Sequence, residues 1–280
     1  MKKCGFTINF NGYLSVTDRP LVMGIVNVTP DSFYDASRVE SDGLRERIAS
    51  MLADGADIID VGACSTRPSG EFVSEQEELR RMHTALDIID NAFPKAVVSV
   101  DTFRASVVRE CVARHNVAII NDVSGYDWDE NMLDAVADAR RAYVLTHSGG
   151  RAGEEPHYAN LVPDVLKTLG EKLWQLRQRG VNDVIVDPGF GFAKSLDDNY
   201  ELFAHLQEFE ILNAPLLVGV SRKSMITKVL GCEAKEALNG TTALNCFALA
   251  KGADILRVHD VKEAVQAVTL YTKMVASKNV

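Results

Sequence analysis

Short apolar runs alternate with longer amphipathic runs along nearly the whole chain. Runs rich in Val, Ile and Leu with few polar positions are typical of strands that are buried on both faces. They predict eight strands, at 21–26, 58–61, 97–100, 118–120, 143–145, 184–186, 216–218 and 255–258. The segments between them have the 3.6-residue periodicity of helices. These predict helices at 43–53, 74–91, 104–113, 132–139, 164–178, 199–207, 242–250 and 261–275.

Local signals support these boundaries. Asn11-Gly12 lies between two short alternating segments, 7–10 and 13–16, which predicts a β-hairpin before the first buried strand. Ser74 followed by Glu77 has the spacing of a capping box at a helix start. Gly180 and Gly252 suit the residues just after two helices.

Eight strands alternating with eight helices is the pattern of an α/β protein with the (β/α)8 TIM-barrel fold. We therefore expect a TIM barrel with an N-terminal β-hairpin, formed by a single domain over residues 1–280. An open doubly wound sheet is the alternative. It is disfavoured because the glycine pattern of dinucleotide-binding sheets, GxGxxG, does not follow the first strand.

Composition narrows the class of protein. Apolar residues make up 46% of the 280 positions and charged residues 25%, which suffices for a large core. A net charge of -9 argues against a nucleic-acid-binding surface. The five cysteines contain no CxxC pair, which favours a reducing compartment and neither disulfides nor a zinc site. The N-terminus lacks the apolar core of a signal peptide, and no apolar run is long enough to span a bilayer, so we expect a cytoplasmic protein without membrane contacts.

Polar or ionisable residues follow every predicted strand. TIM-barrel active sites form at the carboxyl ends of the strands, so these residues are the candidates for chemistry. Asp187 is the sharpest case, because it ends an apolar strand and is followed by Pro188 and Gly189. Each candidate also has a structural interpretation: Asp187 could cap a turn, Asp101 could cap the next helix, Arg67 could be a surface residue, and His259 could be a rim residue.

The candidate residues fall into chemical groups. Guanidinium and imidazole groups suit an anionic ligand, since the guanidinium fork matches phosphate oxygens; these are Arg67, Arg257 and His259. Carboxylates and amides suit a flat heterocycle with several N–H groups; these are Asp101, Asn121 and Asp187. Lys223 could lie over the same ring or polarise a carbonyl, and the amide oxygen of Asn27 could be a ligand of Mg²⁺. Apolar walls near the mouth are expected from Phe33, Phe190 and Phe192.

Taken together, the strand-end motifs resemble those of the dihydropteroate synthase family, in the same order from about residue 21 to 261. They are Asn27-Val-Thr-Pro-Asp-Ser-Phe, Ser65-Thr-Arg-Pro, Val100-Asp-Thr, Asn121-Asp-Val-Ser-Gly, Asp187-Pro-Gly-Phe-Gly-Phe, Ser221-Arg-Lys-Ser and Arg257-Val-His-Asp. The resemblance implies a homodimeric transferase of folate biosynthesis with a TIM-barrel fold. It would join p-aminobenzoate to 6-hydroxymethyl-7,8-dihydropterin pyrophosphate, release pyrophosphate, use Mg²⁺ and be a target of sulfonamides.

The resemblance also implies roles for individual residues. The pterin would be held by Asp101, Asn121, Asp187 and Lys223. The pyrophosphate and its metal would be held by Asn27, Arg67, Arg257 and His259. The p-aminobenzoate site would be lined by Thr66, Pro68, Phe192, Ser221 and the stem of Lys223. Chemically, the acids can stabilise a cationic pterin after pyrophosphate leaves, and the arylamine needs positioning more than deprotonation.

Three positions depart from the family pattern. Ala63 and Ser69 stand where the family usually has glycine. Because residues with a side chain have less backbone freedom than glycine, the loop between them is expected to be more restricted. Thr146 stands where the family often has methionine next to the pterin, so packing against the ring is expected to differ. Sulfonamide response is the property that these departures bear on.

Two other functions share part of the pattern. A methyltransferase that takes a methyl group from methyltetrahydrofolate to a corrinoid would keep the Asp101, Asn121 and Asp187 set but would not need Arg67, Arg257 and His259. A non-catalytic pterin-binding paralogue would keep the ring-binding acids and lose phosphate-binding residues. The presence of the arginine and histidine set favours the synthase.

Overall fold

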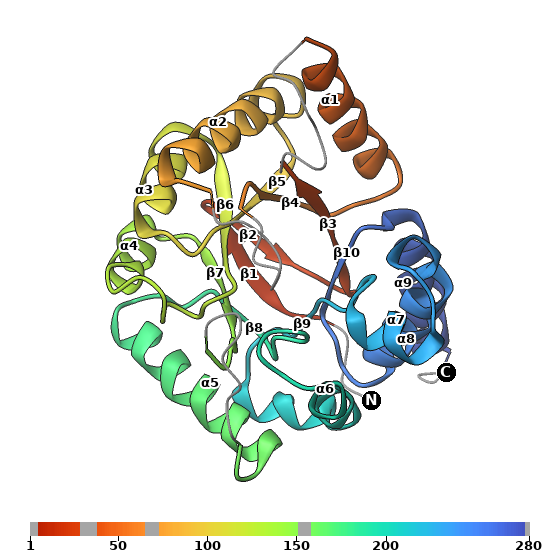
Figure 1. Cartoon of the computed structure of the whole chain (residues 1–280). Helices are drawn as coiled ribbons and strands as arrows, with labels where there is room; N and C mark the ends of the chain where they lie inside the picture. The colour runs from red at the N-terminus through yellow and green to blue at the C-terminus, as the bar shows by residue number, and fades with distance from the viewer. Residues whose placement is uncertain (1–4, 29–37, 65–72, 151–157, 278–280) are drawn as a thin grey trace.

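The strands form one parallel barrel after a short hairpin (Figure 1). The computed structural model describes residues 5–28, 38–64, 73–150 and 158–277, with side chains of the second segment from residue 42. The hairpin strands are β1 (Thr7–Phe10) and β2 (Tyr13–Val16). The barrel strands are β3 (Leu21–Asn27), β4 (Ile58–Gly62), β5 (Val97–Asp101), β6 (Val117–Asp122), β7 (Ala142–Thr146), β8 (Val184–Asp187), β9 (Leu217–Val218) and β10 (Ile255–Val258).

Helices surround the barrel on its outside. They are α1 (Arg38–Ala53), α2 (Glu75–Ala92), α3 (Ala105–Arg114), α4 (Met132–Ala139), α5 (Leu161–Gln178), α6 (Leu196–Ala204), α7 (Ser224–Leu230), α8 (Leu238–Ala250) and α9 (Val261–Ala276). Two 3₁₀ segments, Leu206–Leu212 and Ala234–Glu236, lie between the last helices.

The sheet closes on itself. Its strand order is β8-β7-β6-β5-β4-β3-β10-β9, and a parallel bridge between Val186 and Leu216 joins its two edges. Val186 also donates its backbone N–H to the carbonyl of Pro215 at 2.9 Å. The predicted TIM barrel is therefore confirmed, and the open doubly wound alternative is wrong because both edge strands are paired.

The hairpin covers the amino end of the barrel. Asn11 and Gly12 both adopt positive φ, 49° and 91°, as a two-residue hairpin turn requires. Ile8 of β1 is 1% exposed and packs with the inward-facing apolar residues at the bottom of the barrel, among them Met23, Ile58 and Leu217. The lower half of the barrel is thus a filled apolar core, which leaves only the carboxyl end available for a site.

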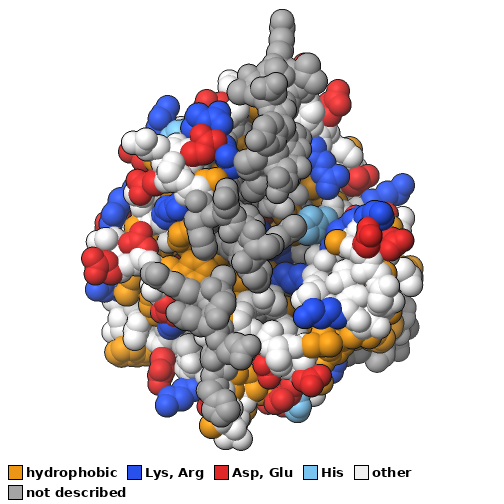
Figure 2. All heavy atoms as spheres, viewed as in Figure 1, with side chains coloured by type: hydrophobic (Ala, Val, Ile, Leu, Met, Phe, Trp, Pro, Cys, Tyr) orange, Lys and Arg blue, Asp and Glu red, His pale blue; other side chains and the backbone are white. Residues whose placement is uncertain are grey.

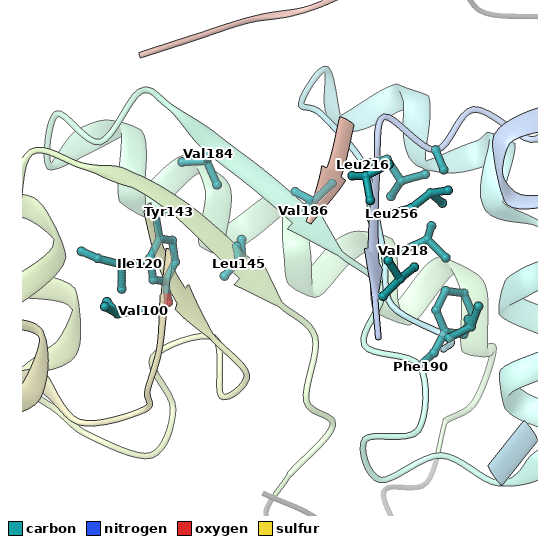
Figure 3. Close-up of a cluster of buried hydrophobic side chains, with 14 of the residues drawn as sticks. Val100, Ile120, Tyr143, Leu145, Val184, Val186, Phe190, Leu216, Val218 and Leu256 are labelled. Carbon is teal, nitrogen blue, oxygen red and sulfur yellow. The ribbon is translucent and has the colours of Figure 1, made fainter. Parts of the chain in front are cut away.

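A second, larger core lies between the barrel and the helices. Figure 3 shows part of it, where outward-facing strand residues such as Val186, Val218 and Leu256 pack together. Acidic and basic side chains are interspersed over the helices on the face of the molecule in Figure 2. None of the described helices combines the length and apolar character that a membrane-spanning segment needs.

The eight predicted helices correspond to α1–α6, α8 and α9, whereas α7 and the starts of several helices were missed. Helix α8 begins four residues before its expected start, because Gly240 is a helical residue that packs against α7. A Cβ there would lie 2.5 Å from the Ile226 side chain, so the contact needs glycine. Helix α6 begins and ends three residues early, because a capping box of Ser195 and Asp198 fixes its start. Ser74 caps α2 as expected.

We predict that the Ile8 plug contributes strongly to stability. Ile8→Ala should lower the free energy of unfolding by about 2–4 kcal/mol, because the cavity cannot collapse under a closed barrel. Leu14→Ala, in the same hairpin but 69% exposed, is the control and should change it by less than about 0.5 kcal/mol. Urea titration followed by circular dichroism measures both, and equal effects would mean that the hairpin does not close the barrel.

Candidate active site

The barrel interior changes from apolar to polar towards the carboxyl end. Side chains on a strand point to the same face every second residue, and four strands follow an apolar inward residue with a polar one at this spacing. These pairs are Ile58 and Asp60 on β4, Ile119 and Asn121 on β6, Ile185 and Asp187 on β8, and Ile255 and Arg257 on β10. The strand pattern alone therefore delivers a ring of polar groups above the apolar floor.

Arg257 links its own strand, β10, to β4 and β5. Its Nε donates to Asp60 Oδ2 at 2.7 Å, and its Nη2 donates to Asp101 Oδ2. The same Asp60 oxygen accepts from Asn121 Nδ2 at 3.1 Å. This contact uses the amide N–H of Asn121, so its carbonyl oxygen is the atom left to accept from a ligand.

Asp101 is not the cap of α3. The first backbone N–H groups of that region are satisfied by other residues: Arg104 donates to Thr102 Oγ1 at 3.2 Å, and Ala105 donates to Asp129 Oδ2 at 2.8 Å. The Asp101 carboxylate instead faces Arg257. The structural alternative for this residue is therefore excluded.

Asp187 and Lys223 form the opposite side of the ring. Asp187 is 6% exposed, and its Oδ1 accepts from the backbone N–H of Gly189 at 2.7 Å, so it does fix the turn after β8. Lys223 donates to the carbonyl of Phe190 at 2.6 Å and lies 4.7 Å from the centre of the Phe192 ring. Lys223 and Phe192, assigned together to one subsite from the sequence, are thus in contact.

Burial raises the pKa values of the acids at this site and lowers that of the lysine. It raises the pKa of Asp101 to about 7, with Arg257 opposing and Asp60 adding to the shift. Burial also raises the pKa of Asp187, with Lys223 opposing it. It lowers the pKa of Lys223 to about 8. Burial works against the charge of Arg257 too, but Asp60 and Asp101 outweigh it and raise its pKa. Desolvated charges of both signs thus share this pocket, as in many active sites.

Ser221 and His259 lie together at the ends of β9 and β10. The two side chains are 3.0 Å apart, from Ser221 Oγ to His259 Nδ1, and the backbone N–H of His259 donates to the same hydroxyl at 3.2 Å. Arg47 of α1 donates to the His259 carbonyl at 2.9 Å. The rim of the mouth here carries a hydroxyl, an imidazole and a guanidinium group side by side.

Asn27 ends β3 next to the β4 terminus. It is in register with Gly62, which in turn pairs with Asp101. The described residues contain no group of three or more His, Cys, Asp or Glu side chains that could enclose a metal. Mg²⁺ often takes most of its ligands from phosphate and water, so the side-chain oxygen of Asn27 is the protein ligand to be tested for such an ion.

Several predicted residues fall outside the described part of the chain: Phe33, Thr66, Arg67, Pro68 and Ser69. Phe190 was expected to line the mouth, and this is wrong. Its ring is fully buried in the outer core, 5.7 Å from the ring of Phe203, because it points away from the barrel axis towards α6 (Figure 3).

Two charged residues were missed by the sequence analysis. Asp60 lies inside a strand, where an acid in an apolar run was read as part of the strand rather than of the site; its inward phase, two residues after Ile58, was the available signal. Lys194 follows the Gly-rich loop, and its Nζ binds three backbone carbonyls. A lysine directly after a glycine-rich loop carries no such signal in sequence.

Two of the three departures from the family pattern lie within the described residues, and both are buried. Ala63 is fully buried beyond β4, and Thr146 is 1% exposed at the end of β7. Within the described part of the chain, Thr146 Oγ1 and Asp60 Oδ1 have no hydrogen-bond partner. Burial lowers the pKa of His147 to about 3, so this imidazole is neutral. The pocket floor thus offers unpaired polar atoms to a ligand.

Comparison with known proteins identifies the family. The pterin-binding enzyme family matches residues 23–259. The dihydropteroate synthase of Escherichia coli (strain K12) is 40% identical over 266 residues, covering 92% of this chain and 93% of that protein. A Yersinia pestis dihydropteroate synthase, solved with a sulfonamide drug, aligns with a TM-score of 0.89 at 36% identity over 97% of this chain and all of that one. A Xanthomonas albilineans dihydropteroate synthase, solved with 4-aminobenzoic acid, has a TM-score of 0.88 at 37% identity over 96% and 98% of the two chains.

The chain belongs to the pterin-binding enzymes. Within that class it belongs to the dihydropteroate synthases, which are transferases of folate synthesis, and not to the methyltransferases.

We predict that Asp60 tunes Asp101. Because Asp60 contributes to the raised pKa of Asp101, Asp60→Asn should lower that pKa from about 7. The carboxyl ¹³C shift of Asp101 followed against pH measures it. Asp57→Asn, three residues earlier and paired with Arg19, is the control and should leave the Asp101 pKa unchanged.

The same substitution should change the pH dependence of stability. The folded pKa of Asp101 lies above its unfolded value, so the folded state binds the extra proton between about pH 4 and 7, and stability falls as pH rises through that window. Asp60→Asn should make this fall smaller. If both the pKa and the slope stay as in the wild type, burial alone sets the titration of Asp101.

Proposed function

We propose that the mouth of the barrel joins p-aminobenzoate to 6-hydroxymethyl-7,8-dihydropterin pyrophosphate and releases pyrophosphate, and that sulfonamides compete with p-aminobenzoate. The observation that carries the proposal is the buried ring of Asp101, Asn121 and Asp187 around Arg257. Its acceptors suit the N–H groups of a pterin. The Xanthomonas albilineans relative, solved with 4-aminobenzoic acid, supports the second substrate.

The proposed mechanism follows from the charges. As pyrophosphate leaves, positive charge develops on the pterin, and the Asp101 and Asp187 carboxylates stabilise it. Lys223 and Phe192 hold the arylamine beside the reacting carbon, so that proximity replaces base catalysis. Arg257, with His259 and Arg67, neutralises the departing phosphates. Ser221 belongs to the proposed arylamine subsite; Thr66 and Pro68, which the family resemblance also implies for it, lie outside the described residues.

Mg²⁺ is part of this proposal. It would neutralise pyrophosphate oxygens, with Asn27 as a protein ligand. The residue roles agree with the geometry at Lys223, Phe192, Ser221 and His259. Arg257 lies deeper than a phosphate-only role needs, because it binds Asp60 and Asp101, so we assign it to the boundary between pterin and pyrophosphate.

Asp187 tests the pterin site. Asp187→Asn should weaken binding of a pterin analogue by about 100-fold, because it removes a buried charged acceptor. Asp183→Asn is a matched control just before the same strand: Asp183 accepts from the backbone N–H of Asn9 at the hairpin end, 2.8 Å away. Calorimetric titration should show normal binding in this control. Tight analogue binding by Asp187→Asn would remove the residue from the site.

Chelation tests the metal. Excess EDTA should abolish turnover but leave binding of a pterin without pyrophosphate within about twofold, because the metal acts on the phosphates. Added Mg²⁺ should restore turnover. Undiminished turnover in excess chelator would contradict the assignment.

We also propose a homodimer, in the cytoplasm. The outer face of α8 is apolar at the helical spacing i, i+3, i+4, i+7, with Ala243, Cys246, Phe247 and Ala250 all exposed. Leu270 and Met274 of the neighbouring α9 are 73% and 47% exposed, and α7, α8 and α9 lie together on one side of the barrel (Figure 1). Small residues beside one aromatic let the same helix of a second copy approach closely. Within the described part of the chain, Cys111, Cys232 and Cys246 form no disulfide, which fits a reducing compartment.

Phe247→Asp should convert the dimer to a monomer, because a charge would be buried at the centre of the interface. Trp174→Asp changes another exposed aromatic residue, on α5 and 63% exposed, and should leave the mass unchanged. Light scattering after size exclusion gives both masses. A wild-type monomer, or a dimer that survives Phe247→Asp, would contradict the proposed interface.

A further inference from the structure

The loop after β8 has an unusual backbone. Every second residue from 189 to 193 has a positive φ: 72° at Gly189, 80° at Gly191 and 45° at Ala193. A left-handed conformation is unfavourable for alanine, so surrounding contacts must hold Ala193 there. Gly189 also packs so closely on the loop after β7 that a Cβ would lie 2.0 Å from the His147 carbonyl oxygen.

This backbone directs three carbonyl oxygens to one point. The oxygens of His147, Gly189 and Phe192 lie 3.0, 3.0 and 3.2 Å from Lys194 Nζ. Converging carbonyl dipoles repel one another unless a cation lies between them. An ammonium group has three N–H donors, and here each one has an acceptor. Burial lowers the pKa of Lys194 to about 7, and the nearby Asp187 opposes this shift, so the group is mainly an ammonium ion below that pH.

The contacts of Lys194 join two strand ends. His147 follows β7, whereas Gly189 and Phe192 follow β8, so one side chain ties both loops together. Asn199 of α6 fixes the same loop from outside, accepting from Gly191 N–H at 2.7 Å and donating to the Lys194 carbonyl at 3.2 Å. The loop is therefore held from inside by a charge and from outside by an amide.

The loop after β8 supplies two contacts of Lys223 at the mouth of the barrel. Lys223 Nζ binds the Phe190 carbonyl and lies over the Phe192 ring. Both partners lie between Gly189 and Lys194, so their positions depend on the conformation that Lys194 fixes. The positive charge of Lys194 also lowers the pKa of Asp187, which burial raises.

We propose that Lys194 is a positioning residue: its ammonium group acts as a built-in cation for three backbone carbonyls and so sets Phe192 and Lys223 for the arylamine substrate. This inference rests on the proposed function, since it concerns the p-aminobenzoate subsite of the same mouth. Lys194 itself binds backbone and acts on the substrate through Phe192 and Lys223.

The test compares Lys194→Met with Lys194→Arg in the full-length protein. Lys194→Met keeps the stem and removes the charge; it should raise the KM for p-aminobenzoate and the inhibition constant of a sulfonamide together, by about tenfold or more, because the subsite is misplaced. The affinity for a pterin without pyrophosphate should change by less than about threefold, since the Asp101 ring is untouched.

Lys194→Arg separates charge from geometry. Its planar fork retains the charge but cannot reach three carbonyls arranged as a tripod. It should therefore leave unchanged the pH at which kcat/KM falls on the acid side, where Asp187 becomes protonated. It should still raise the KM for p-aminobenzoate. In Lys194→Met the fall on the acid side should move to higher pH, because Asp187 loses a nearby positive charge.

The control is Lys251→Met. Lys251 also donates to a backbone carbonyl, that of Ala204 at 2.7 Å, but it lies after α8 and away from the mouth. Its substitution should leave every kinetic constant unchanged. Hydrogen exchange of the amides at 189–192 gives a readout without turnover: Lys194→Met should exchange faster there, and Lys251→Met should not.

The outcomes separate the two proposals. A wild-type enzyme that makes no dihydropteroate would overturn the proposed function. A wild-type enzyme that turns over, with Lys194→Met or, if that variant does not fold, Lys194→Arg showing an unchanged KM for p-aminobenzoate, would overturn the positioning role. A loss of kcat with unchanged KM values would also overturn it.

Discussion

The structure depends on one buried cation held between two carboxylates. Arg257 reaches Asp60 and Asp101 from the last barrel strand, and Asp60 in turn holds Asn121. Burial raises the pKa of Asp101 to about 7; the Asp60 carboxylate adds to this shift and the Arg257 guanidinium opposes it. The raised pKa means that folding alone disfavours the charged form of Asp101, whereas a cationic pterin intermediate beside it would favour that form.

The apolar end of the barrel and two lysines surround this charged group. Ile8 and the apolar residues below the ring fill the amino end of the barrel. Lys223 and Lys194 bring positive charge to the other side, near Asp187. The barrel interior is therefore an apolar core at one end and a candidate reaction site at the other. On β4, β6, β8 and β10 the inward side chains change from apolar to polar within two residues.

Much of this could be predicted from the sequence, for identifiable reasons. Strand runs such as 184–186 were recognisable because parallel strands are buried on both faces, and the residues that end them had to gather at one mouth. Asp60 escaped because its role depends on strand phase and on Arg257, almost two hundred positions away. Lys194 escaped because its ligands are backbone carbonyls, which leave no side-chain signature. Helix α7 and the start of α8 escaped because Gly240, a poor helix former, is required by the close contact with Ile226.

The most direct test is pyrophosphate release from 6-hydroxymethyl-7,8-dihydropterin pyrophosphate with Mg²⁺, measured with and without p-aminobenzoate. The account predicts release coupled to dihydropteroate formation and suppressed by a sulfonamide. Binding of the pterin without any release would contradict it, because the ring of acids would then recognise the pterin without promoting departure of its pyrophosphate.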